Sequence, residues 1–154
     1  MPITSILGRI LTAVHETVKH LDIEGFTAAQ IKKQKLPYKR DRVAAGLFVT
    51  PTPEIYRPGV SNCEDDIGYG VAITMLQASN QSLEFDDDSD IFIRNRDRII
   101  EHYLPTTDVP LPAVPEVYTV EIEPGPVFDP GAFAAQFDGS GFVLRFWVRK
   151  LRRQ

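Results

Sequence analysis

The stretch IGYGVAITMLQASNQSLEFDDDSDIFIRNRDRIIEHYL, residues 67–104, decides the fold because its apolar period changes halfway along. Large apolar side chains stand at every second position of Val71–Met75, which predicts a largely buried β-strand over 67–78. An acidic turn follows at 80–88. Over about 89–104 the apolar side chains recur at three- and four-residue steps, which predicts an α-helix. A strand that leads into a helix in this way indicates a fold that mixes both kinds of element.

Another helix opens the chain. Apolar residues at three- and four-residue steps predict an amphipathic helix over about 4–21. Thr4 or Ser5 is its expected N-cap. For the later helix we expect Asp88 or Ser89 as the N-cap, because acidic side chains are favoured at the positive end of the helix dipole.

The segments between these elements are rich in basic residues or in proline. Residues 32–42 carry six basic side chains and predict a solvent-facing connector, and VAAGLFVT at 43–50 has the character of a short strand. Prolines in 51–66 predict a long exposed loop, because proline cannot donate a hydrogen bond to a sheet. Four prolines in 105–115 predict an extended, polyproline-like spacer between the two halves of the chain.

The C-terminal third begins with a strand predicted over EVYTVEIE at 116–123. The side chains expected on one face of this strand are Tyr118, Val120 and Ile122. A long connection is expected at 123–141, with one helical turn at about 131–136.

The last strand is FVLRFWVRKLRR, which starts at residue 142 and alternates apolar with polar or mixed side chains. The expected inward side chains are Phe142, Leu144, Phe146 and Val148. The expected outward side chains are Val143, Arg145, Trp147 and Arg149. This pattern predicts a strand with one face in water.

The predicted order is helix, two strands, helix, two strands, which indicates an α+β fold in which two helices pack on a mainly antiparallel four-stranded sheet. With 154 residues, 43% of them hydrophobic, we expect residues 1–154 to form a single domain with a basic C-terminal tail at about 149–154. Charged residues interrupt the first apolar run too often for a signal peptide or a membrane span.

Charge is segregated along the chain, although its net value is only −4. Basic side chains gather in 32–42 and 145–153, and acidic ones in 64–66 and 86–90. Surfaces of opposite charge favour contacts between copies or with a charged partner. The predicted subunit or partner contacts are Lys32, Lys33, Lys35, Lys39, Arg40, Arg42, Glu64, Asp65, Asp66, Asp86, Asp87, Asp88, Arg149, Arg152 and Arg153.

No motif predicts catalysis, a cofactor or a metal site. The histidines of 15–20 are five residues apart, whereas a helical zinc motif needs four. Asp86, Asp88 and Asp90 have the spacing of a calcium loop, but Ile91 stands where that loop needs glycine. The single cysteine, Cys63, excludes an intrachain disulfide framework. A small metal- or ligand-binding domain stays open as an alternative, with the acidic clusters as its densest polar groups.

The chain resembles the tail-terminator or tail-completion proteins of long-tailed bacteriophages and prophages over nearly its whole length. The similarity lies in the element order and in LPYKRDRVAAGLFVTPTPEIYRPGVSNCEDDIGYGVAITML at 36–76, RNRDRIIEHYL at 94–104, EVYTVEIEPGPVFDPGAF at 116–133 and FVLRFWV at 142–148. In that family small α+β subunits close into a ring, usually of six, that caps the tail tube and joins it to the head.

The resemblance implies a structural virion protein, assembled in the host cytoplasm, with no cofactor and no catalytic activity. Its implied partners are other copies of the chain, the tail tube and the head-neck proteins, with DNA passing through the ring without specific recognition. Another phage neck or minor tail component is the alternative within the same class.

The charge pattern agrees with a ring, because head-to-tail contacts need two different surfaces on one subunit. We expect the predicted loops at 51–66 and 123–141 to contact neighbouring subunits. Acidic segments such as 64–66 or 86–90 could line the lumen and repel the phosphates of passing DNA.

Overall fold

The computed structural model describes residues 5–38, 43–58, 64–104 and 109–151. Its helices are α1 (Ile6–His20), α2 (Asp87–His102), a short α3 (Pro130–Ala134) and a 3₁₀ turn η1 (Ala28–Gln30). Its strands are β1 (Ile31–Lys33), β2 (Gly46–Pro58), β3 (Glu64–Ala78), β4 (Val117–Glu123) and β5 (Phe137–Leu151). The predicted α+β class is confirmed.

The strands form one five-stranded sheet in the order β1-β2-β3-β5-β4. All neighbours run antiparallel except β1 and β2, which pair in parallel from Ile31 opposite Leu47 to Lys33 opposite Val49. The predicted four-stranded sheet is therefore wrong by one strand. β1 was missed because its three residues are too few to show a period, and its two lysines gave 32–42 the composition of a connector.

The predicted loop at 51–66 is also wrong, because β2 continues to Pro58 and β3 starts at Glu64. Prolines are tolerated here because β2 becomes an edge strand after Val49, the last of its residues that pairs with β1. The carbonyl of Val49 accepts from the amide of Gln34 at 3.0 Å, so the backbone NH and CO groups of Val49 point away from β3. Alternation along the strand places the nitrogen of Pro51 on the same outer side, where no bond within the sheet is lost.

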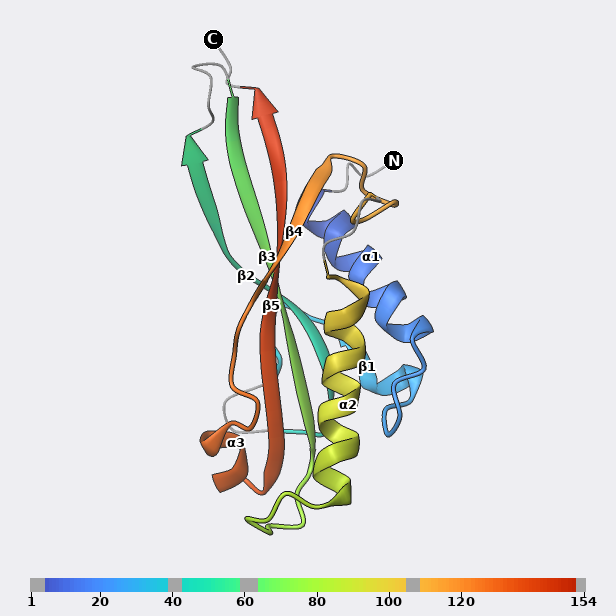
Figure 1. Cartoon of the computed structure of the whole chain (residues 1–154). Helices are drawn as coiled ribbons and strands as arrows, with labels where there is room; N and C mark the ends of the chain where they lie inside the picture. Colours follow the sequence, from blue (N-terminus) through green and yellow to red (C-terminus); the bar gives the residue numbers. More distant parts are fainter. Residues whose placement is uncertain (1–4, 39–42, 59–63, 105–108, 152–154) are drawn as a thin grey trace.

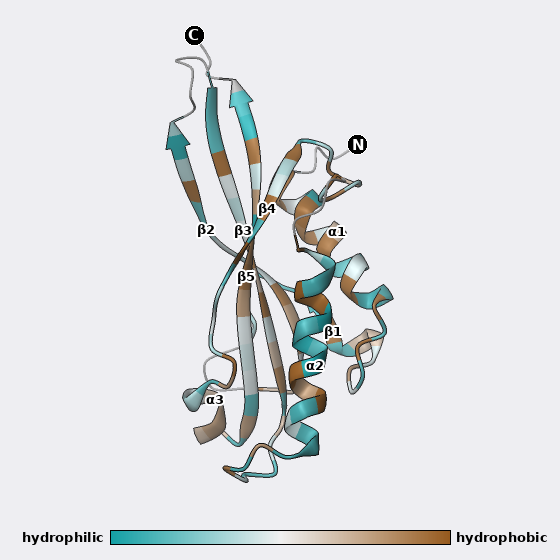
Figure 2. Cartoon of the chain, in the orientation of Figure 1, coloured by the Kyte–Doolittle hydropathy of each residue, from teal (hydrophilic) through white to brown (hydrophobic). Residues whose placement is uncertain are grey.

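Both long helices lie against one face of the sheet (Figure 1). Apolar stripes on α1 and α2 turn toward that face, as the brown segments of Figure 2 indicate. The core between the layers includes Val14 of α1, Phe92 and Ile99 of α2, Ile73 of β3 and Leu144 of β5, all 0% exposed. The apolar periods of the helices and of the two central strands are therefore confirmed.

Capping residues set where the helices begin. Ser5 caps α1 by accepting a hydrogen bond from the amide of Gly8 at 3.0 Å, which confirms one of the two expected N-caps. α2 begins earlier than predicted, because its N-cap is Asp86, which accepts from the amide of Ser89 at 2.9 Å. Asp88 and Ser89 thus lie inside the first turn, where the helix dipole stabilises acidic side chains.

We expect the Asp86 carboxylate to stabilise the fold in a pH-dependent way. The hydrogen bond from the Ser89 amide, together with the Asn80 side chain, lowers the pKa of Asp86 below its ordinary value of 3.8. A lowered pKa adds stability above that ordinary value, and this stability is lost as the pH falls through the folded-state pKa. Thermal unfolding of wild type and Asp86→Asn should therefore differ at pH 7 and converge as the pH falls below 3.8 through the folded-state pKa of Asp86. Asp87→Asn is the control, and a constant Asp86→Asn difference at every pH would contradict the assignment.

The segment before β4 folds into turns instead of a polyproline spacer over its described residues, 109–116. Leu111 and Val114 are buried in the core, and the amide of Val114 donates to the carbonyl of Leu111 at 2.9 Å. The proline-rich segment is held in turns because the side chains of Leu111 and Val114 are buried in the core. Residues 105–108 of the predicted spacer lie outside the described ranges.

β4 itself is confirmed as a strand, and Val120 and Ile122 share the core side as predicted, but the predicted faces are wrong at its start. The register shifts between Val117 and Thr119, so the extra residue Tyr118 changes the alternation. Val117 and Val120 are buried, whereas Tyr118 is 43% exposed.

The predicted connection at 123–141 is shorter in the structure, because β5 starts at Phe137. The helical turn expected at about 131–136 is present as α3, which begins at Pro130. Asp129 caps α3 by accepting from the amide of Gly131 at 3.2 Å. The chain between β4 and β5 is thereby held close to the end of the sheet (Figure 1).

Candidate interaction surfaces

Three strands run on past the helical layer and form a projection that we call the outer blade (Figure 1). It consists of residues 52–58 of β2, 64–70 of β3 and 145–150 of β5. Along this part of β2, the side opposite β3 pairs with no described strand. The blade therefore presents an open β2 edge, and its exposed positions are 53–58 of β2 and 149–150 of β5.

An aromatic ring, the indole of Trp147, covers part of the face of the blade that is turned away from the helices. Trp147 is only 2% exposed, although the sequence predicts it in water. The guanidinium carbon of Arg57 lies 4.3 Å from the ring centroid, a cation–π geometry. Gly68 stands opposite Trp147 in the ladder, and a Cβ added there would lie 3.0 Å from the indole. The glycine thus makes room for Trp147 to lie flat on the sheet.

Arg145 is the second residue predicted in water that is buried, with 5% exposure. Its guanidinium donates to the Glu123 carboxylate at 2.7 and 3.1 Å. It also donates to the carbonyls of Pro53 at 2.7 Å and Gly68 at 3.1 Å. A Cβ added at Gly70 would lie 2.7 Å from this guanidinium, so Gly70 leaves space for it. Arg145 consequently ties β5 to β2, β3 and the end of β4.

Arg149 lies nearer the tip and is more exposed. It pairs with Asp66 at 3.3 Å and Glu64 at 3.7 Å, and its guanidinium carbon lies 4.8 Å from the ring centroid of Tyr118. The hydrogen bond with Asp66 raises the pKa of Arg149. Desolvation, followed by the hydrogen bond with Asp66, raises the pKa of Tyr118.

These ion pairs involve three of the residues that were predicted to contact other chains. Glu64, Asp66 and Arg149 were expected to meet opposite charges on other subunits, but they pair with one another within one chain. The blade is therefore a surface of Arg–aromatic and Arg–carboxylate pairs instead of a basic patch. Two buried polar atoms on the described blade, the Trp147 Nε1 and the Thr52 Oγ1, have no hydrogen-bond partner.

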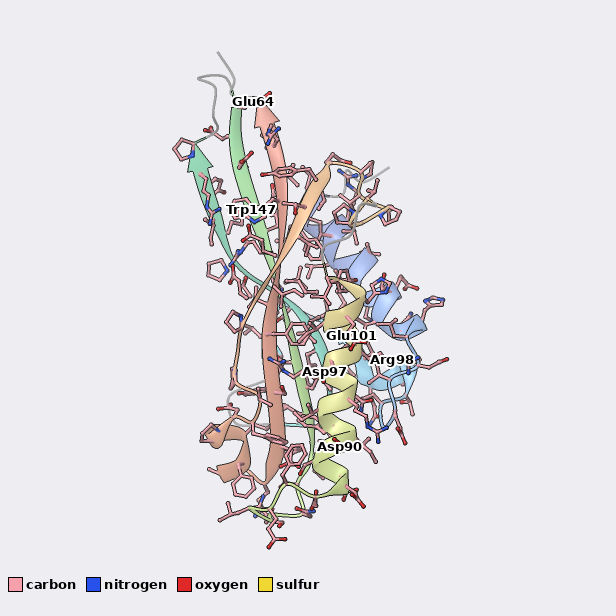
Figure 3. All side chains as sticks on the ribbon, in the orientation of Figure 1. Glu64, Asp90, Asp97, Arg98, Glu101 and Trp147 are labelled. Carbon is pink, nitrogen blue, oxygen red and sulfur yellow. The ribbon has the colours of Figure 1, made fainter. Side chains whose placement is uncertain are left out.

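The second predicted acidic group lies at the opposite end of the molecule. Figure 3 shows Glu64 at the tip of the blade and Asp90 at the far end of α2. Asp86 is committed to the helix cap, whereas Asp87 and Asp88 are exposed in the first turn. The two acidic groups therefore do not form one continuous surface on a single subunit.

No metal centre is present among the described residues, where no group of three or more His, Cys, Asp or Glu side chains could hold an ion. His15 Nε2 lies 2.8 Å from the carbonyl of Ile31, and His20 Nδ1 lies 2.6 Å from that of Glu16. These contacts with different backbone groups explain both histidines without a metal.

A cleft of about 370 Å³ lies beside the acidic end of α2, between the turn after β3 and α3. Its apolar walls include Leu83, which is 92% exposed, and Phe85, which is 64% exposed. Phe85 contacts Phe128 edge to face at 6.2 Å between ring centroids. The acidic residues of the lining are Glu84, Asp129 and Asp138. We call this site the acidic cleft.

The acidic cleft was not predicted from the sequence. The sequence feature that could have revealed it is the pair of large apolar residues, Leu83 and Phe85, within the polar segment 80–88. Apolar side chains in a turn that holds no core position are candidates for binding a partner.

The basic segment after η1 is partly strand. Lys32 and Lys33 lie in β1, and the Lys33 ammonium donates to the Thr12 hydroxyl at 2.8 Å. Lys35 lies in the bend that follows, next to Leu36, which is 71% exposed. The remaining predicted basic contacts lie outside the described residues: Lys39, Arg40, Arg42, Arg152 and Arg153.

Comparison with known proteins finds no family model and no curated protein that matches this chain. Within the described part of the chain, no helix is long and apolar enough to cross a membrane.

Proposed function

We propose that this chain is a ring-forming structural subunit of a phage tail, a tail-terminator or tail-completion protein that caps the tail tube and joins it to the head-neck. The observation that carries the proposal is the outer blade. Three strands extend beyond the helices that cover the rest of the sheet, with an open β2 edge. Such an extension favours contact with further chains, because an unpaired strand edge is a surface that proteins bury or protect.

The side chains of the blade support an interface. Trp147, Arg57, Tyr118 and Arg149 form two stacked Arg–aromatic pairs on one face. Arginine and tyrosine are among the residues most enriched at the energetic centres of protein interfaces, and Tyr118 and Arg149 are exposed, whereas Trp147 is buried within its own chain. Tyr56 adds a 67% exposed ring at the β2 edge of the blade.

A closed ring also needs two different surfaces on each subunit. The described residues offer several separate surfaces, among them the outer blade at one end of the molecule and, at the other end, the turn after β3 and α3 with the acidic cleft between them (Figure 1). The proposed partners are other copies of the chain, most simply six in a ring, together with tail-tube and neck proteins. DNA would pass through the ring without sequence recognition, and acidic side chains facing the lumen would repel its phosphates.

The location of the chain in finished particles tests this function. An antibody against the chain, carrying a gold label, should mark the head-proximal end of isolated tails in electron micrographs. Particles made without the chain should separate into heads and tails. Label along the tail shaft or at its distal end would instead indicate a minor tail component, and joined particles without the chain would contradict the proposal.

A small ligand- or metal-binding domain is the second candidate, and the acidic cleft is the observation that favours it. Its volume and aromatic walls suit a small apolar ligand. Calcium or magnesium at micromolar concentration should raise the melting temperature if the acidic groups bind metal, by the linkage between binding and folding. We expect no shift, because the acidic residues that line this cleft are spread over the turn after β3, the N-cap of α3 and β5.

A further inference from the structure

The acidic cleft combines apolar walls with negatively charged side chains, and it therefore suits an apolar side chain flanked by positive charge. Of the described residues that line it, three are acidic and none is basic. Apolar groups dominate its walls, and Leu83 and Phe85 are exposed beside it. Asp87 and Asp88, in the first turn of α2, add negative charge next to the turn that forms one wall. An occupant that brings both an apolar group and cations would therefore complement the cleft.

The same chain carries a segment with that chemistry, the bend at 35–38 that follows β1. Leu36 projects from the bend with 71% of its surface exposed, and Tyr38 is 41% exposed. Lys35 precedes Leu36 directly, and Lys32 is exposed on β1. We call residues 32–38 the basic bend. None of its residues lines the acidic cleft of its own chain.

The other exposed apolar group with a basic neighbour fits less well. Ile55 and Tyr56 precede Arg57 on the outer blade, but Glu54 and the ion-paired Glu64 lie on the same blade. Arg57 is itself stacked on Trp147. The blade therefore offers the cleft less free positive charge than the basic bend does.

We infer that the acidic cleft of one copy receives Leu36 of a second copy, with Lys32 and Lys35 of that copy facing the carboxylates of the cleft. This inference rests on the proposed ring and names one of its subunit contacts. The contact is heterologous, because the bend and the cleft are different surfaces of the same chain. A contact of this kind propagates from subunit to subunit and closes when the rotation between neighbours allows it.

Charge reversal in matched pairs tests the contact, with the assembly of the full chain followed by sedimentation. Lys32→Glu with Lys35→Glu, and separately Glu84→Lys with Asp138→Lys, should each weaken association roughly 10- to 100-fold, since each places like charges together. The chain that carries all four substitutions should recover most of the wild-type association. All four side chains lie outside the buried core, so the variants retain their fold.

Leu36→Asp removes the apolar anchor and should weaken association by a similar factor. Val109→Asp is the matched control, because Val109 is 55% exposed and belongs to neither surface. This control should assemble as the wild type does.

Disulfide trapping identifies the contact directly. In a Cys63→Ser background, chains with Leu36→Cys and chains with Leu83→Cys should form a crosslinked dimer only when they are mixed and oxidised. Chains that carry both substitutions should give a ladder of crosslinked species that ends at the ring size. Leu36→Cys mixed with Val109→Cys is the control and should stay uncrosslinked.

The outcomes separate the contact from the ring. If the wild type forms a closed oligomer and the charge-reversed and Leu36→Asp variants assemble equally well, the inferred contact is overturned while the proposed function stands. If crosslinks form at random, including with Val109→Cys, the contact is likewise overturned. A wild-type chain that is monomeric at its highest soluble concentration contradicts the ring and this contact together.

Discussion

The Trp147→Ala variant should lose about 4 kcal/mol of unfolding free energy, the largest effect that we expect from a single substitution. Trp147 is 2% exposed and is among the largest fully buried side chains of the described chain. Alanine would remove the ring between Gly68 and the guanidinium of Arg57, and the strand backbones cannot move in to fill the space because the β2–β3–β5 ladder holds them. Equilibrium unfolding in urea, followed by circular dichroism, measures the loss.

Trp147→Phe is the matched control for this substitution. Phenylalanine keeps a ring under Arg57 and removes the indole Nε1, which has no hydrogen-bond partner. We expect it to lose only about 1 kcal/mol. A Trp147→Ala variant as stable as Trp147→Phe would show that the ring lies in water, as the alternation of the strand had predicted.

Arg145→Met should have the second largest effect, a loss of about 3 kcal/mol. The substitution leaves the Glu123 carboxylate without its bidentate partner and removes the donor for the carbonyls of Pro53 and Gly68. The Glu123 side chain is 36% exposed and regains water, so much of the cost falls on the buried carbonyl of Gly68, which loses its donor. Urea unfolding measures this loss as well.

Two further variants test the role of the pair. Adding Glu123→Gln to Arg145→Met should recover part of the lost stability, since it removes the unpaired charge, and the double-mutant cycle gives the coupling. Arg149→Met should cost much less, because the Arg149 side chain is 54% exposed and its ion pairs lie in water. Equal losses for Arg145→Met and Arg149→Met would contradict the assignment of Arg145 as the buried tie between the strands.

The parts of the fold that could be predicted from sequence are those with a long apolar period. α1, α2 and the central strands β3 and β5 each bury one clear face, and their periods extend over seven residues or more. β1 could not be found because it is three residues long. Its partner β2 was predicted only as far as residue 50, because whether Pro51 breaks a strand depends on whether that strand is at an edge, which is a property of the whole sheet.

The blade was harder to predict because its burial depends on residues distant in the sequence. Trp147 and Arg145 alternate with core residues as a solvent-facing set would, yet Gly68, Gly70, Pro53 and Glu123 enclose them. The role of the charged residues as contacts with other chains stays a prediction. Their pairing within the chain could not be predicted, since Glu64 and Asp66 lie more than 80 positions from Arg149 and meet it only through the β3–β5 register.

The measurement that tests the central claim most directly is native mass spectrometry of the purified chain over a range of concentrations, combined with negative-stain imaging of the assembled species. We expect one closed oligomer, six copies of the 17.3 kDa chain, which appears in the images as a ring with a central hole. A chain that stays monomeric throughout, or a continuous series of open-ended oligomers without a preferred size, would contradict the ring.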